Sequence, residues 1–131
     1  MSPRVRQLVE LRKRLENERW AFAQKHGFAY TRAQNFKNCI VIRWKTSRTK
    51  YKIIYPRIEE YTKIAHDLSD KYKLWNDEDP FLDSSLRLLG AGIYCFNEWG
   101  HNTWAIPNEY KEMQEYVLSK LPKWAKVSMK K

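Results

Sequence analysis

The stretch NCIVIRW (residues 38–44) limits the possible folds of this chain more than any other part of the sequence. The apolar residues from Cys39 to Ile42 follow one another without interruption, and three of these four are β-branched. Such a run favours a β-strand, and the lack of polar alternation is typical of a strand buried on both faces. We therefore expect this strand to be covered from two sides, in a chain of 131 residues that suits a single domain (1–131).

An amphipathic helix is predicted to precede this strand. Ser2 and Pro3 form a typical helix start, because serine caps the first turn and proline suits the first helical position. Apolar residues then recur at near-helical spacing until Gly27, which favours a helix end. These apolar positions are Val5, Leu8, Leu11, Leu15 and Phe22. We expect a helix from about residue 3 to His26, with an apolar face that a sheet or another helix must cover.

The net charge of +10 lies entirely in the N-terminal part of the chain. Residues 1–50 hold 13 Lys and Arg against three Glu, whereas residues 51–131 hold 12 residues of each sign. A basic surface of this kind binds an acidic protein or nucleic acid, or it is a solvated helix face that keeps the protein in solution. All three interpretations remain open here, and nucleic acid is the least favoured partner.

Several shorter runs complete the predicted elements. FAYT (28–31) predicts a weak strand, and TKYKIIYP (49–56) predicts a strand that pairs with 38–44 in a hairpin. Residues 57–91 suit either a short helix or an irregular crossover. The fold class expected from this order is α+β, with an N-terminal helix, an antiparallel β-meander, a long loop that carries Cys95, and a C-terminal helix.

The C-terminal helix is predicted over 108–121. Asn108 suits the cap of this helix, and Pro122 marks its end. We expect Trp124 to pack back onto the body of the domain and the tail KVSMKK (126–131) to fray. The apolar face of the helix is expected to hold Tyr110, Met113, Val117 and Leu121.

The stretch GIYCFNEWGHNTWAIP (92–107) holds the residues with the clearest chemical pattern. Gly92 stands three residues before Cys95, and Trp104 follows nine residues after it. Pro107 then comes just before the predicted C-terminal helix. A cysteine between a glycine and a downstream Trp, Pro and helix is more informative than any one of these residues alone.

This pattern resembles the ubiquitin-conjugating enzymes. The pair Tyr55-Pro56, at the end of a predicted strand, and the basic first helix add to the resemblance, which covers roughly residues 3–121. The chain is most similar to divergent bacterial members of that family, such as the small conjugating-enzyme-like proteins of CBASS antiphage operons. The resemblance implies that Cys95 is the nucleophile and that Gly92 and Trp104 shape its surroundings.

The resemblance also implies the reaction and the partners. Such a protein forms a thioester through its cysteine with the C-terminal glycine of a ubiquitin-like protein or of a cyclic-oligonucleotide synthase, and then passes the acyl group to an amine. An activating enzyme is a further expected partner. The basic first helix would meet one of these proteins through an acidic surface.

Four residues are the candidate catalytic groups. Beside the Cys95 nucleophile, Asn97 or Asn102 is a candidate donor to the oxyanion, and His101 is a candidate base for the incoming amine. Asp83 is a candidate for positioning a lysine nucleophile. Each residue also has an ordinary structural interpretation, because cysteine is often buried and Asn is common in turns.

Two other functions remain open. The family's His-Pro-Asn triplet is absent before Cys95, where the chain reads DPFLDSSLRLL, and this favours a non-catalytic interaction module of the same shape. A basic nucleic-acid-binding domain is the other alternative. Cys39, which lies inside a predicted strand, is expected to be structural under each of these hypotheses.

Cofactors, metals and membrane insertion are not expected. Neither cysteine has Cys or His partners at zinc-site spacing, and the four glycines do not cluster into a phosphate-binding loop. No apolar run reaches the about 18 residues that a transmembrane helix requires. The charged N-terminus lacks the apolar core of a signal peptide, so we expect a cytoplasmic protein with reduced thiols.

Overall fold

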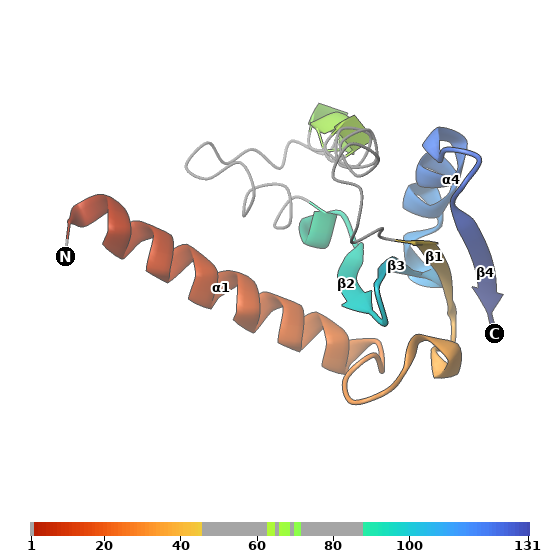
Figure 1. Cartoon of the computed structure of the whole chain (residues 1–131), viewed down its shortest axis with the longest axis horizontal. Coiled ribbons are helices and arrows are strands. Elements are labelled where there is room, and N and C mark those ends of the chain that lie inside the picture. The colour runs from red at the N-terminus through yellow and green to blue at the C-terminus, as the bar shows by residue number, and fades with distance from the viewer. Residues whose placement is uncertain (1, 46–62, 65, 69, 72–87) are drawn as a thin grey trace.

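The computed structural model describes residues 2–45, 63–64, 66–68, 70–71 and 88–131. These residues form a long N-terminal helix, a four-stranded antiparallel sheet and a second helix near the C-terminus (Figure 1). The α+β class is therefore confirmed.

Some predictions lie outside the described residues. The strand expected over 49–56, most of the segment 57–91, and the position of Asp83 belong to this group. Within 57–91, residues 63–64, 66–68, 70–71 and 88–90 are helical.

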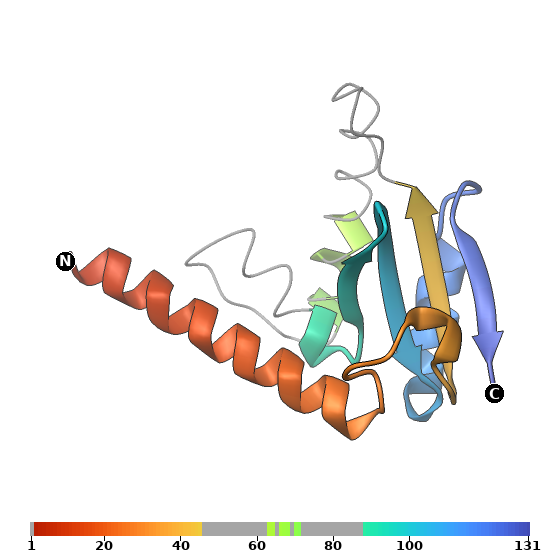
Figure 2. The ribbon, with the colours of Figure 1, turned by 60° about the horizontal axis from the view of Figure 1, so that its bottom comes forward.

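Helix α1 spans Pro3–Lys25, as the sequence predicted. Its first turn is capped by Ser2, whose Oγ accepts a hydrogen bond from the backbone N–H of Val5 at 3.3 Å. Gly27 follows the helix with φ of +76°, the left-handed conformation that commonly ends a helix. The N-terminal end of α1 lies far from the sheet, whereas its C-terminal half approaches β2 (Figures 1 and 2).

The sheet has the strand order β2-β3-β1-β4 (Figure 2). Strand β1 is Cys39–Lys45, β2 is Tyr94–Glu98, β3 is His101–Pro107, and β4 is Lys126–Lys130. All three neighbouring pairs are antiparallel. The first strand in the sequence therefore lies inside the sheet, between two strands that come much later in the chain.

This order corrects the predicted meander. The two edges of β1 are paired along Cys39–Arg43, one edge with β3 and the other with β4. A strand has only two edges, so the hairpin expected between 38–44 and 49–56 is wrong at these positions. Local spacing favoured the nearest strand as a partner, but pairing across long sequence separations took both edges.

The predicted loop around Cys95 is also wrong. Residues 94–107 form a β-hairpin in which β2 and β3 are joined by the two-residue turn Trp99-Gly100. Both turn residues have positive φ, +54° and +75°, which matches the twist of a tight hairpin. Cys95 therefore sits within a strand and not in a loop.

The predictions for the tail and for residues 28–31 are wrong as well. The tail forms strand β4, because Val127 and Met129 alternate with polar residues at the two-residue period of a strand. Residues 28–31 form turns, and the short 3₁₀ helix η1 (Ala33–Asn35) follows. The aromatic residues here supply two buried side chains, Phe28 and Phe36, without strand pairing.

Helix α4 spans Lys111–Lys120 and follows the 3₁₀ helix η2 (Asn108–Tyr110). The predicted cap is wrong, because α4 begins after Tyr110 and no side chain caps it. Asn108 instead accepts a hydrogen bond from the side-chain amide of Gln114 at 2.9 Å. The end before Pro122 and the predicted apolar face are confirmed, since this face packs into the core through Tyr110, Met113, Val117 and Leu121.

The sheet is covered on both faces, as the sequence of β1 required. On one face the core consists of alternate residues of β1 and β3 packed against α4, with Trp124 at its border. These strand residues are Ile40, Ile42, Trp44, Trp104 and Ile106. On the other face Cys39, Val41 and Ala105 pack against Ala23 of α1 and against Phe28, Ala33 and Phe36.

No helix among the described residues is long and apolar enough to cross a membrane.

Candidate functional site

Cys95 is held in the middle of the hairpin. It pairs with Trp104 across β2 and β3, and its partly buried side chain packs against the core cluster on the α4 side of the sheet. Its backbone carbonyl accepts a hydrogen bond from Nη2 of Arg19 at 2.6 Å. The thiol therefore belongs to a rigid strand whose main chain is tied to α1.

Arg19 is a residue that sequence reasoning missed. Besides its hydrogen bond to Cys95, its guanidinium lies 5.6 Å from the centre of the Tyr94 ring, where a cation–π interaction forms. These contacts join positions 75 or more residues apart, so the local pattern around Arg19 gives no signal for them. They hold α1 and β2 together at the candidate nucleophile.

Three of the four predicted catalytic residues lie on one face of the sheet. Cys95 and Asn97 are two residues apart on β2, and Asn97 is directly opposite Asn102 of β3. Residues with these relations project to the same side of a sheet. Asn97 is exposed and Asn102 is partly buried, so both amides lie at the solvent-exposed end of this face of the sheet.

His101 is placed on the opposite face. It lies across from Glu98 of β2 and from Lys45 of β1, and its Nδ1 is 3.1 Å from the backbone oxygen of Trp99. The strand alternation that brings Asn102 to the side of Cys95 takes His101 away from it. The structure thus assembles the thiol with the two amides and separates the imidazole from them.

Gly92, which precedes β2, and Trp104, in the middle of β3, shape the hairpin in different ways. Gly92 has φ of +90°, and a Cβ atom there would lie 2.7 Å from the ring of Tyr110. Only glycine allows this close approach. Trp104 is 1% exposed and makes an edge-to-face contact with Trp44 at 5.1 Å, so it fills the core. Trp99, at the turn of the same hairpin, is instead exposed.

The two cysteines differ strongly in their surroundings. Cys39 is 1% exposed, and burial raises the pKa of its thiol to about 11, partly offset by Lys130. This residue is structural, as predicted, because almost none of it is thiolate near neutral pH. Cys95 is partly exposed, which makes it the more accessible of the two thiols.

A second ionisable cluster joins the end of α1 to η2. One carboxylate oxygen of Glu109 lies 3.6 Å from Nζ of Lys25 and 3.2 Å from Nε2 of His26. The contact with His26 is an ion-pair contact without hydrogen-bond geometry. Burial lowers the pKa of His26, although Glu109 opposes the shift, and burial raises the pKa of Tyr110. The sequence placed Tyr110 on an apolar helix face but gave no signal for the contacts of Lys25 and His26 with Glu109, which join the end of α1 to η2.

Within the described part of the chain, no group of three or more His, Cys, Asp or Glu side chains gathers in a way that would hold a metal ion. Comparisons with known proteins do not identify the chain either. No family model, no curated protein and no solved structure matches it.

Proposed function

We propose that the protein is a conjugating-enzyme-like acyl carrier that forms a thioester through Cys95. The thiolate attacks an activated carbonyl carbon at the C-terminal glycine of a partner protein, and the activating group leaves. An amine of the target then attacks the same carbon and displaces the thiolate. The sequence resemblance to the ubiquitin-conjugating enzymes motivates this reaction, and the contrast between the two thiols supports it.

The single observation that carries the proposal is the partial exposure of Cys95 on a face of the sheet that also holds two amides. Asn97 and Asn102 share its face, and either side chain has N–H groups that stabilise the oxyanion of the tetrahedral intermediate. Loss of one such donor typically lowers the rate by about 10²–10³. His101 has no part in this reaction, since it lies on the other face.

The expected partners follow from the charge of the chain. The excess of +10 in residues 1–50 suits an acidic surface on an activating enzyme or on the protein that supplies the C-terminal glycine. A ubiquitin-like protein and a cyclic-oligonucleotide synthase of an antiphage operon are the two expected sources of that glycine. A cytoplasmic location fits this proposal, because it keeps both thiols reduced.

Native-state labelling and adduct trapping test the proposal. Cys95 should react with an alkylating reagent at neutral pH while Cys39 stays protected, as read by peptide mapping. A protein adduct that a thiol reductant releases should form in lysate of the native host, and it should disappear in Cys95→Ala and remain in Cys39→Ala. An adduct that persists in Cys95→Ala would refute the assignment of Cys95.

A non-catalytic interaction module is the second candidate. Two observations favour it: the Cys95 side chain packs against the core, and its backbone carbonyl accepts a hydrogen bond from Arg19. This function predicts that both cysteines resist alkylation and that Cys95→Ala lowers stability instead of abolishing an adduct. The labelling experiment therefore separates the two candidates directly.

A further inference from the structure

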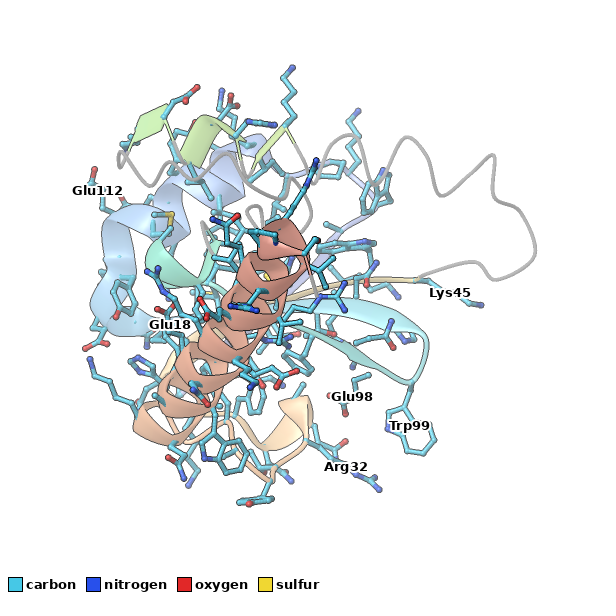
Figure 3. All side chains as sticks on the ribbon, turned by 90° about the vertical axis from the view of Figure 1, so that its left-hand side faces the viewer. Glu18, Arg32, Lys45, Glu98, Trp99 and Glu112 are labelled. Atoms are coloured by element: carbon cyan, nitrogen blue, oxygen red, sulfur yellow. The ribbon has the colours of Figure 1, made fainter. Side chains whose placement is uncertain are left out.

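Two pairs of side chains, joined through the short segment from Tyr30 to Arg32, are defined here together as the aromatic row: Trp20 with Tyr30, and Arg32 with Trp99. Trp20 and Tyr30 contact each other edge to face at 5.1 Å, and they are 45% and 92% exposed. Arg32, two residues after Tyr30, lies 5.8 Å from the ring centre of Trp99, which is 77% exposed (Figure 3). Large exposed aromatic residues gathered in this way are typical of binding surfaces.

The backbone at two members of the row is costly for such residues. Tyr30 has φ of +60° and Trp99 has φ of +54°. Among the described residues other than glycine, only Asn38 shares this conformation, and asparagine adopts it readily. Trp99 also takes the place that asparagine usually fills in a two-residue turn before glycine. Neither aromatic ring is buried, so core packing does not explain why these residues occupy strained positions.

A hydrogen bond ties the hairpin turn to the segment that carries Arg32. The carboxylate of Glu98, the residue before Trp99, accepts a hydrogen bond from the backbone N–H of Ala33 at 3.2 Å. This bond ties the hairpin turn to η1, next to Arg32. Glu98 is the acidic group nearest to Trp99 in sequence, and this bond engages one of its carboxylate oxygens. The hairpin tip and the segment from Tyr30 to Arg32 therefore present their side chains as one preorganised surface.

A basic track leads to the row along α1. Arg6, Lys13 and Trp20 are spaced seven residues apart, which places them on one stripe of the helix. The stripe is opposite the one that buries Leu15, and both basic side chains are exposed. Over 14 residues the track is about 21 Å long. Glu10, four residues after Arg6 and three before Lys13, lies beside the track, which therefore carries two positive charges against one negative.

We infer that the aromatic row and its basic track bind single-stranded nucleic acid. Bases stack on Trp99 and Tyr30, the Arg32 guanidinium contacts a base or a phosphate, and the phosphate backbone follows Lys13 and Arg6. Combining separated aromatic rings with a positive track is how proteins bind single strands without reading sequence. A duplex keeps its base faces stacked inside and offers no surface to these rings. The site uses neither Cys95 nor its face of the sheet.

Fluorescence anisotropy with labelled oligo(dT) and oligo(rU) of about 12 nucleotides tests this inference at low salt. Both probes should bind more tightly than a duplex of the same length. Trp99→Ala and Tyr30→Ala should each weaken binding about 5- to 150-fold, whereas Trp99→Phe, which keeps a ring, should weaken it far less. Both residues are exposed, so melting curves should confirm that the variants fold.

The matched charge control is Lys126→Ala on β4, at the sheet edge farthest from the hairpin. Arg32→Ala should weaken binding and lower the slope of log affinity against log salt by about 0.7, and Lys126→Ala should change neither. Equal effects of Arg32→Ala and Lys126→Ala, or normal binding by Trp99→Ala, would refute the site. Failure to bind either oligonucleotide, with row-dependent binding to anionic lipid vesicles instead, would refute it too and identify a membrane surface.

Discussion

Trp99 and Trp104 lie five residues apart on the same hairpin, but one is exposed and the other is buried. At the tip, Trp99 is exposed in a strained turn, whereas in the middle of β3 Trp104 is almost completely buried between Trp44 and the rest of the core. Packing decides which residue is possible at position 104. At the tip the side chain is not packed, and the positive φ favours asparagine over tryptophan. The presence of Trp99 there therefore points to binding. The same short element thus has a structural half and a candidate functional half.

The largest expected effect is a difference between the two tryptophans. Trp104→Ala should lower the free energy of unfolding by about 3–5 kcal/mol, because it leaves a cavity in the core. Trp99→Ala should change it by less than about 0.5 kcal/mol. Urea unfolding monitored by circular dichroism measures both values. Comparable losses in the two variants would mean that the tip is part of the folded core after all.

The two glycines of the hairpin region extend this comparison. Gly92→Ala should cost about 2–4 kcal/mol, since its Cβ would collide with the Tyr110 ring and its backbone φ is positive. Gly100→Ala at the tip should cost only about 1–2 kcal/mol, from the backbone alone, because nothing lies within 4 Å of the new Cβ. Thermal melts of the two variants compare their losses of stability. A larger shift for Gly100→Ala would contradict the difference between base and tip.

The base of the hairpin should also respond to alkaline pH through Cys39, which lies opposite Pro107. Burial raises the pKa of this thiol from 9.0 to about 11, so the folded state favours the protonated form. That stabilisation is complete below pH 9 and should be lost between pH 9 and 11, by about 1 kcal/mol per pH unit at most. Denaturant unfolding of the protein and of Cys39→Ala across this range isolates the thiol. Parallel curves for the two proteins would show that Cys39 does not contribute.

The smallest predicted effect has the opposite sign. Trp99→Asn should raise the free energy of unfolding by about 0.5–1 kcal/mol, because asparagine tolerates the positive φ of this turn. The same change should abolish stacking at the hairpin tip. A gain in melting temperature with a loss of oligonucleotide affinity would show that stability and binding oppose each other at this position. A loss of stability would mean that the Arg32 contact outweighs the strain.

The sequence predicted those elements whose signal is local. Helix α1 with its Ser2 cap, strand β1 and the apolar face of α4 all follow from spacing within one segment. The position of β4 beside β1 does not, because five residues with weak strand character gain their structure from a partner about 85 positions away. Strand pairing of this range has no local pattern.

The geometry of the candidate site was less predictable. The sequence singled out the segment that holds Cys95, Asn97 and Asn102 but not its strand geometry, and that geometry decides which side chains share a face. Counting alternation outward from the turn at Trp99-Gly100 would have separated His101 from Asn102 and the exposed tryptophan from the buried one. The contact of Arg19 with Cys95 is three-dimensional and has no counterpart in the sequence pattern.

The position of β1 between β3 and β4 has a consequence for how the protein is made. On the ribosome β1 emerges early, and its two sheet neighbours, residues 101–107 and 126–130, are translated much later. Until then its backbone edges and its apolar side chains lack their native partners in β3 and β4, which is the condition that favours slow folding and contact with chaperones. The sheet can close around β1 only once β4 has been made, so its pairing is delayed by the more than 80 residues that separate these two strands.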